Sequence, residues 1–333
     1  MPDSAPASLS RPSLAEEHEA LCSGVALVDR APLGRLELLG RDRARFLQGL
    51  VTCDVKGLAT GQGAFGFVPS SQGKILSSLV VLALPDRLWL LLPPGKGREI
   101  SQHLGKYVLA DDVQILPLAD MVPITLAGPR AGEVLAEVGE LPAEPFEHRR
   151  AVVTGIEVHL LREALLGVPA FTLLVSASVV KPLVAQLLQR PGVVPAGNEA
   201  LELARIEAGI PAFGIDYGPD HFPQETGLEP LGVSYTKGCY LGQEVIARIH
   251  YRGKANRAAR RLVFLNDLPL PGARLLTEAG EEVGTLGSVA ESPTLGRLGI
   301  AVLHRKSYEP GTELAVEGGG RVRLEELPPL RLE

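Results

Sequence analysis

The chain has 333 residues, of which 45% are hydrophobic and 22% charged, and this is the composition of a globular protein of two or three domains. A net charge of -6 argues against broad nucleic-acid binding, which needs a cationic surface. No apolar run approaches the roughly 20 residues that span a bilayer, and the start MPDSAPASLSRPS lacks the apolar segment of a signal peptide.

We expect a cytoplasmic protein without a membrane or nucleic-acid partner. The cysteine usage agrees with a cytoplasmic location. The three cysteines, Cys22, Cys53 and Cys239, are too few and too scattered for a disulfide framework. We expect free thiols, and we interpret Cys22 and Cys53 as buried and inert because free cysteines usually are.

The first half of the chain mixes short strands and helices. After an expected disordered arm over residues 1–13, the alternating Leu36 and Leu38 predict a strand. Asp42 is expected to begin a helix, and the runs KILSSLVVLAL and RLWLLLP predict two adjacent strands. Apolar residues from Ile100 to Val108 then follow helical spacing.

A second unit is expected to begin near Asp120. The segments MVPITLA, AVVTGIEVHLLRE and FTLLVSAS predict strands, and the apolar residues from Val180 to Leu188 predict a helix. No glycine-rich phosphate loop follows a strand, so a nucleotide-binding fold lacks support. From about Asn256 onward, short strand segments divided by glycine, proline and asparagine predict a small β-barrel or sandwich.

The segment NEALELARIEAGIPAFG predicts a helix that carries one carboxylate on its apolar side. Asn198 is a plausible N-cap, and Gly209 followed by Pro211 ends the helix. At about 100° per residue, Glu207 lies on the side of Leu203 and Ala204, whereas Arg205 is expected to point the other way. A buried carboxylate needs hydrogen-bond donors, so the pattern favours equally an internal salt bridge or cap and a group that binds a buried ligand.

The segment SYTKGCYLGQEVIAR places Cys239 in a polar, glycine-rich setting before a predicted helix. A helix N-terminus and the neighbouring Lys237 would both stabilise a thiolate at Cys239. Metal binding has little support because no CxxC, HExxH or paired-histidine spacing occurs, and a GxSxG serine-hydrolase motif is absent.

Long stretches of the chain resemble the YgfZ family of folate-binding proteins, relatives of the glycine-cleavage T-protein, an aminomethyltransferase. The likeness is carried by ARIEAGIPAFGIDY, by FPQETGLEPLGVSYTKGCYLGQEVIARIHYRG and by LLGRDRARFLQGLVTCDV, and it runs from about Leu14 to Leu330. The KGCYxGQE element is its specific part.

This resemblance implies an α+β fold, a three-lobed ring of mixed α/β domains around a folate channel with a C-terminal β-barrel. The implied limits are residues 14–118 together with about 196–253 for a discontinuous folate-binding domain, 119–195 for a second α+β domain, and 254–333 for the barrel.

The resemblance also implies roles for individual residues. Glu207 matches the glutamate that holds the pterin ring in the T-protein, and a carboxylate suits that ring because it accepts two parallel hydrogen bonds. Cys239 is the implied reactive group, and Lys237 matches a position that would attract the carboxylate of folate. The other implied folate-binding residues are Gly238, Tyr240, Gln243 and Glu244.

One departure separates this chain from the T-protein. Ser77 and Ser78 stand where that enzyme has an aspartate pair beside the reacting folate nitrogen. A neutral hydroxyl does not replace a carboxylate in stabilising a cationic amine, so aminomethyl transfer in glycine cleavage is not expected.

Three hypotheses follow from the resemblance and this departure. The leading one is a tetrahydrofolate-binding accessory factor for assembly or repair of iron–sulfur clusters, with the client or assembly proteins as partners. The alternatives are a folate-dependent aminomethyltransferase or demethylase acting on a small amine, and a folate-binding regulatory module without catalysis.

Overall fold

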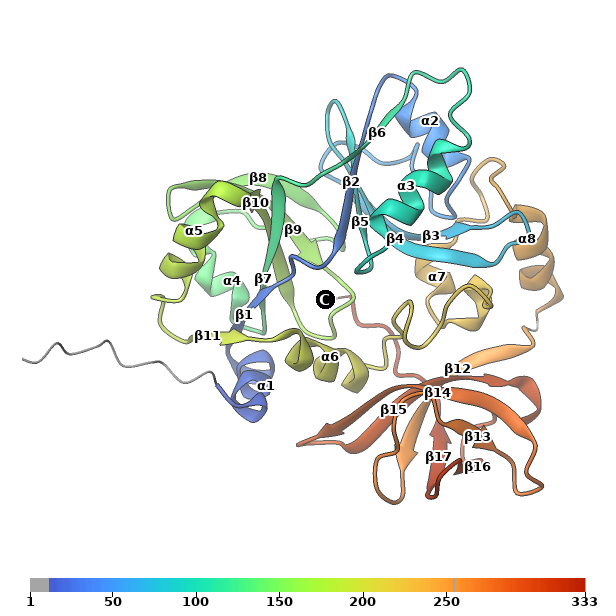
Figure 1. Cartoon of the computed structure of the whole chain (residues 1–333). Coiled ribbons are helices and arrows are strands. Elements are labelled where there is room, and N and C mark those ends of the chain that lie inside the picture. The colour runs from blue at the N-terminus through green and yellow to red at the C-terminus, as the bar shows by residue number, and fades with distance from the viewer. Residues whose placement is uncertain (1–11, 254, 333) are drawn as a thin grey trace, which may run out of the picture.

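The computed structural model describes residues 12–253 and 255–332, and these form three lobes around a common centre (Figure 1). Two lobes are sheets covered by helices, and the third is a closed barrel. The α+β fold with a C-terminal β-barrel is therefore confirmed. Within the described ranges, no helix has the length and apolar character needed to cross a bilayer. Residues 1–11 of the predicted arm lie outside the described residues.

The first lobe is a five-stranded antiparallel sheet in the order β3-β4-β5-β2-β6. Helices α2 (Arg43–Gln48) and α3 (Gly97–Gly105) cover one of its faces, because their apolar sides pack on the inward leucines of β2. The predicted strands at Leu36 and Leu38 and at KILSSLVVLAL and RLWLLLP are confirmed. The strands of this sheet are β2 Gly34–Leu39, β3 Gly63–Pro69, β4 Ile75–Ala83, β5 Leu88–Leu92 and β6 Gln114–Pro117.

The second lobe is a six-stranded sheet in the order β11-β1-β7-β10-β9-β8, in which β1 and β11 run parallel. Along β1, Val25 and Leu27 pack toward α4 and α5, whereas Ala26 and Val28 pack toward α1 and α6. This alternation places helices on both faces of the sheet. The strands are β1 Val25–Asp29, β7 Met121–Ala127, β8 His148–Val153, β9 Ile156–Glu163, β10 Ala170–Ser176 and β11 Val193–Ala196; the helices are α1 Leu14–Ser23, α4 Ala131–Val134, α5 Val180–Leu187 and α6 Asn198–Glu207.

Strand β1 corrects the predicted division of the chain. Residues 14–118 were expected to lie together in the first domain, but β1 pairs with β7 and β11 of the second sheet. Helix α1 also belongs to the second lobe, because Leu21 is fully buried against α6 and that sheet. β1 is a continuous apolar run, VALV, buried at four successive positions, and such a run does not specify which sheet it joins. The other predicted limits stay predictions.

The third lobe is a barrel in the order β12-β15-β14-β13-β16-β17, closed by the pairing of β12 with both β15 and β17. Its interior is filled by alternate residues such as Leu262, Leu275 and Val322, all fully buried. Closure leaves no unpaired strand edge. The strands are β12 Arg257–Phe264, β13 Arg274–Leu276, β14 Glu282–Ser292, β15 Gly296–His304, β16 Glu313–Val316 and β17 Arg321–Glu325.

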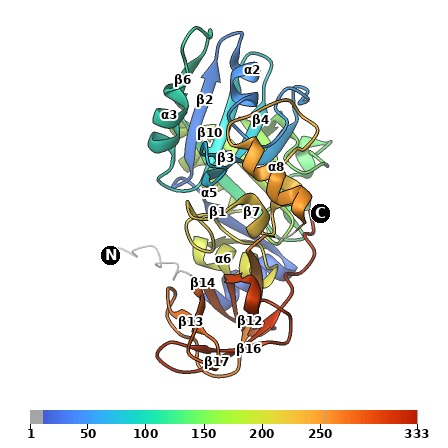
Figure 2. The ribbon, with the colours of Figure 1, turned by 90° about the vertical axis from the view of Figure 1, so that its right-hand side faces the viewer.

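Short elements connect the lobes. Helices α7 (Glu229–Gly232) and α8 (Gln243–Arg252) come between α6 and the barrel in the chain. In space, α8 packs beside β3 and β4 on the outside of the first lobe (Figures 1 and 2). The single 3₁₀ turns are η1 Ala136–Val138, η2 Ala177–Val179, η3 Pro223–Glu225 and η4 Arg305–Ser307.

The three lobes meet at a central apolar cluster. Phe67 and Trp89 of the first sheet face Leu161 and Leu174 of the second across this centre. After β17 the chain leaves the barrel and runs toward the two sheets (Figure 1), where its last leucines pack on the cluster. These leucines are Leu327, Leu330 and Leu332.

Candidate functional site

Glu207 is the last residue of α6, where the helix meets α1 and the barrel. The N-terminal end of α6 is fixed by Glu17 of α1, whose carboxylate accepts a hydrogen bond of 2.8 Å from the Gly197 amide. Its other end is followed by Gly209 at a φ of +67°, a left-handed conformation that favours glycine. The Glu207 side chain is only 13% exposed, so the prediction that it lies toward the protein interior is confirmed.

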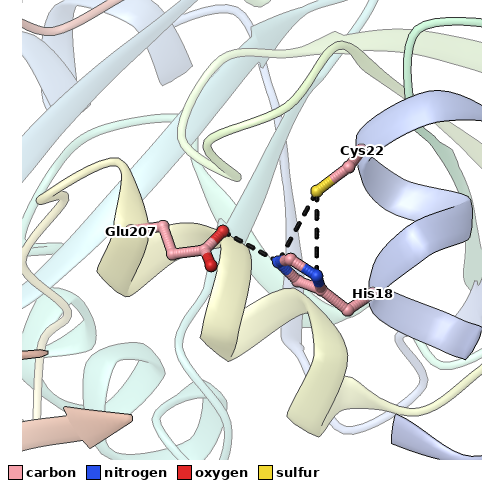
Figure 3. A group of neighbouring side chains, drawn as sticks. All are labelled: His18, Cys22 and Glu207. Carbon is pink, nitrogen blue, oxygen red and sulfur yellow. Dashed lines mark hydrogen bonds and ion pairs between the residues drawn. The ribbon is translucent and has the colours of Figure 1, made fainter. Parts of the chain in front are cut away.

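Both carboxylate oxygens of Glu207 have partners inside the protein. Oε2 lies 2.9 Å from Nε2 of His18 on α1 (Figure 3), and Oε1 accepts a hydrogen bond of 2.5 Å from the Ser292 hydroxyl of β14. The sequence left open an internal salt bridge or cap and a ligand-binding role for Glu207. The structure shows internal partners for both carboxylate oxygens. A pterin ring would have to replace these contacts to bind Glu207, so its folate role stays a prediction.

Cys22 completes this group and corrects its interpretation as a buried, inert thiol. It is exposed, one helical turn after His18, and its Sγ lies 3.5 Å from Nε2 and 3.8 Å from Nδ1 of that imidazole. Partial burial, and then the charges of Glu207 and Glu19, raise the pKa of the Cys22 thiol. The His18–Cys22 spacing of four residues, within a helix with its own capping box at Ser13, is the signal that could have identified the pair.

Arg205 corrects a second expectation. It was expected to point away from the apolar side, but it is 5% exposed and donates to Asp216 at 3.0 Å and to the Ser288 hydroxyl of the barrel at 2.6 Å. Asp216 in turn accepts from the Ser288 amide at 2.7 Å. A buried guanidinium requires such a set of acceptors, and here they join α6 to the barrel.

Lys237 of the KGCY segment is hydrogen-bonded to backbone carbonyls inside the protein. Its ammonium donates to the carbonyls of Gln48, Val51 and Cys53 at 2.7, 2.7 and 2.8 Å, just after helix α2. Burial lowers the pKa of Lys237 to about 8. Because an ammonium has three protons, these carbonyls use all of them, and the predicted attraction of a folate carboxylate stays a prediction.

Cys239 lies on the surface, as do its neighbours Gly238 and Glu244. Helix α8 begins only at Gln243, after Gly242 at a φ of +77°, so Cys239 does not lie in its first turn. Lys237 points into the protein instead of toward this thiol. Neither the helix N-terminus nor Lys237 is therefore placed to stabilise a thiolate at Cys239. The thiol is exposed, so a partner can reach it.

Tyr240 is the buried residue of this segment. It is 7% exposed, and its hydroxyl has no hydrogen-bond partner within residues 12–253 and 255–332. Burial raises its pKa to about 12. The segment packs against the first lobe, away from α6 (Figure 1), so the structure does not bring Glu207 and the KGCYxGQE residues into one site.

A cavity of about 700 Å³ opens over β8, β9 and β10 of the second sheet, and among the described residues Trp89 is its one lining residue from the first sheet. Trp89 of β5, His159 of β9 and Leu174 of β10 line it, with Arg150 of β8. Trp89 is 7% exposed and its indole N–H has no partner in the part of the chain that the structure describes. Apolar walls with a charged side chain beside them are typical of a small-molecule site. The sequence indicated Trp89 only as a strand residue.

A second cavity of about 780 Å³ adjoins this one, and Arg150 and His159 line both. Nε2 of His148 lies 3.1 Å from the Gln62 carbonyl, and its Nδ1 lies 2.5 Å from Nε2 of His159. His148 therefore donates to the carbonyl and accepts from His159. Burial lowers the pKa of His159 to about 3, so the imidazole is neutral at pH 7.

The serines predicted at the T-protein's aspartate positions lie in β4. Ser77 is fully buried and Ser78 is 8% exposed. Burial raises the pKa of Tyr217, and the Ser78 side chain is hydrogen-bonded to this phenol. Asp216, next in the chain to Tyr217, is held by Arg205.

Comparisons with known proteins agree with this architecture. The chain is 24% identical over 316 residues to an aminomethyltransferase of Staphylococcus carnosus, covering 92% of this chain and 86% of that protein. It is 28% identical over 313 residues to a chloroplastic protein of Arabidopsis thaliana named "putative transferase", covering 90% and 70%. The glycine cleavage system aminomethyltransferase T of Bartonella henselae has the same fold, with a TM-score of 0.86, 22% identity and coverage of 95% and 89%.

The family model described as the GCVT N-terminal domain matches residues 2–234. That range contains both sheets and helix α6. It also contains His18, Cys22 and Glu207, whereas Ser292 belongs to the barrel. The chain therefore belongs to the GCVT N-terminal domain family.

Proposed function

We propose that this protein is a tetrahydrofolate-binding factor of the YgfZ type that assists assembly or repair of iron–sulfur clusters in other proteins. Membership of the GCVT N-terminal domain family and relatives named aminomethyltransferases support the folate part. The KGCYxGQE resemblance supports the YgfZ type. The observation that carries the proposal is the cavity over β8, β9 and β10, which Trp89 of β5 also lines.

The residues around this cavity suit a folate. Its volume of about 700 Å³ lies within the usual range of roughly 300–1,000 Å³ for small-molecule sites. Trp89, Met121 and Val158 line the cavity and offer an apolar wall for aromatic rings. Arg150 is exposed beside it, where a guanidinium can pair with the carboxylates of the glutamate tail. The contacts implied for Glu207, Lys237, Gly238, Tyr240, Gln243 and Glu244 stay predictions.

Two features favour an accessory role over aminomethyl transfer. Ser77 and Ser78 offer no carboxylate in β4 to stabilise a cationic amine. The exposed thiol of Cys239, on a glycine-flanked segment, is accessible to a partner protein, such as an iron–sulfur client or assembly protein.

Intrinsic fluorescence tests the folate part, because Trp89 is the only tryptophan in the sequence. We expect tetrahydrofolate to quench Trp89 emission saturably under anaerobic conditions, after correction for absorbance with a free tryptophan derivative. Calorimetric titration should give one site, and Trp89→Phe should bind about 3- to 10-fold more weakly, because it removes part of the apolar wall. Absence of heat and of saturable quenching in the wild type would remove the folate proposal.

Matched variants locate the ligand. Arg150→Gln should weaken binding several-fold, whereas Arg149→Gln should not, because Arg149 pairs with Glu140 and does not line the Trp89 cavity. Glu207→Gln decides the contact implied by the resemblance: unchanged affinity places the pterin in the Trp89 cavity, and a loss of binding with unchanged stability assigns it to Glu207.

The accessory role is tested separately in cells that lack the native gene. Cys239→Ser should lower the activities of iron–sulfur enzymes, whereas Cys53→Ser should not if it folds normally. Equal activities with Cys239→Ser and wild type, combined with a loss for a folate-binding variant, would point to a folate-binding module without thiol chemistry. Turnover of a methylated or aminomethyl donor with tetrahydrofolate would favour the transferase alternative, which the names of the relatives support.

A further inference from the structure

We propose that His18, Cys22 and Glu207 form a binding site for a divalent transition metal ion of the zinc class. One ligand atom of each residue lies within 4.8 Å of the other two. The side chains come from two elements, α1 and the end of α6, and converge on one point (Figure 3). The site does not depend on folate binding.

Two of the three distances between ligand atoms fit tetrahedral coordination with little movement, whereas the Cys22 sulfur and the Glu207 carboxylate lie within 4.8 Å of each other, against roughly 3.6 Å at a tetrahedral zinc ion. Zinc bonds of about 2.0–2.1 Å to imidazole nitrogen, 2.0–2.2 Å to carboxylate oxygen and 2.3 Å to thiolate sulfur place nitrogen and sulfur roughly 3.5 Å apart, and nitrogen and oxygen roughly 3.3 Å apart. The Cys22 Sγ and His18 Nε2 are already 3.5 Å apart. His18 Nε2 and Glu207 Oε2 are 2.9 Å apart, so the metal would separate them by a few tenths of an ångström.

The donor set selects the class of metal. One imidazole, one thiolate and one carboxylate suit Zn²⁺ or its spectroscopic substitute Co²⁺, whereas Mg²⁺ and Ca²⁺ prefer oxygen ligands. The metal bonds replace a hydrogen bond and a thiol contact. Binding releases the thiol proton to solvent, and the ring proton of His18 moves from Nε2 to Nδ1, so that the neutral imidazole binds through Nε2. Three protein ligands leave a fourth position for water or another small ligand.

The surroundings hold two of the ligands and leave a path for the ion. Ser292 donates to the other oxygen of Glu207, which fixes the carboxylate as an outer-shell group does in metal sites. His18 is 3% exposed on a packed helix, so its position is constrained. Cys22 is exposed, so an ion can reach the group from solvent. Because Sγ lies near both ring nitrogens, the imidazole must turn slightly to direct Nε2 at the ion.

Metal titration of the reduced, chelator-stripped full chain tests this proposal. Co²⁺ should bind with a stoichiometry of one, with the intense visible bands of a tetrahedral site and a thiolate-to-cobalt charge-transfer band in the near ultraviolet. Zn²⁺ should displace it and should raise the melting temperature of the wild type. A wild type without charge-transfer absorption, or one that binds no Zn²⁺ in competition with a chromogenic chelator, would overturn the proposal.

Variants separate this site from binding elsewhere. Cys22→Ser should abolish the charge-transfer band, and Cys239→Ser, which changes another exposed thiol, should keep it. Ser292→Ala should weaken Zn²⁺ affinity about 10- to 100-fold, the usual cost of an outer-shell change. Because Cys22 is exposed, Cys22→Ser should fold normally, and the same band in Cys22→Ser and wild type would contradict the assignment. A tetrahydrofolate titration of Cys22→Ser distinguishes this result from a failure of the folate proposal.

Discussion

Individual side chains in this protein obtain their chemistry from partners far away in the chain. Helical spacing correctly predicted that Glu207 lies on the inner side of its helix, yet its partner His18 is 189 positions away. The same spacing was wrong for Arg205, because α6 is buried on more than one side, with Leu201 and Ile206 buried as well as the predicted apolar side. The buried Asp216 and Ser288 accept the hydrogen bonds of Arg205.

The buried histidine pair predicts a pH dependence of stability. Burial lowers the pKa of His159 to about 3 in the folded protein, against about 6.5 in the unfolded chain. The unfolded state therefore binds more protons below pH 6.5, and this contribution to stability is complete above pH 6.5 and is lost as the pH falls toward 3.

Between pH 7 and pH 5 we expect this group to lower the free energy of unfolding by about 2 kcal/mol. His159→Gln keeps a donor for Nδ1 of His148 and should lose most of this dependence, whereas the exposed His304→Gln should keep it. Urea unfolding at both pH values measures the difference. A pH dependence that His159→Gln leaves intact would show that another group carries it.

Helices and strands were predictable where their periodicity is strong, and their ends were not. The strands β4 and β5 follow the predicted segments, and α3 begins near the expected position. However, α3 ends at Gly105 instead of Val108, and Tyr107 is 36% exposed. Backbone geometry at single glycines, which composition does not reveal, fixes several such ends and junctions.

Gly242 at the start of α8 provides a test at this level. A Cβ at this position would approach the Ser70 carbonyl oxygen to 2.4 Å, and the φ is +77°. Gly95 has the same φ of +77° and no atom within 4 Å of its Cβ position. Gly95→Ala should cost about 1 kcal/mol for the left-handed backbone alone.

Gly242→Ala should cost at least about 2 kcal/mol more, because helix α8 must move away from the turn between β3 and β4. Chemical denaturation of both variants measures the two costs. Equal losses would mean that α8 adjusts freely and that this junction is not rigid.

The whole molecule is held together at its centre by the meeting of three lobes and the end of the chain. Leu327 would contact a Cβ at Gly227 at 2.7 Å, and Pro328 would contact one at Gly209 at 2.3 Å. The segment after β17 thus lies close against the backbone that follows α6, and its leucines cover the apolar cluster that the two sheets share.

This packing predicts the effect of changing the last leucines. Replacing Leu327, Leu330 and Leu332 together by alanine should lower the free energy of unfolding by roughly 2–4 kcal/mol, since each is only partly buried. It should also increase binding of an apolar dye to the native protein. Arg331→Ala, an exposed neighbour, is the control. An unchanged stability in the triple variant would show that the end of the chain does not stabilise the centre.

The sequence by itself determined the α+β pattern, a small barrel or sandwich at the C-terminal end, most strands and helices, and the inward position of Glu207. These follow from local periodicity and from turn residues, which act over a few positions of the chain. Only the tertiary structure placed β1 in the second sheet, brought His18 and Cys22 to Glu207, directed Lys237 to three carbonyls, and put Trp89 in the wall of a cavity on the second sheet. Those features depend on contacts between segments that are distant in sequence, and no local pattern specifies which distant atom a buried polar group will meet.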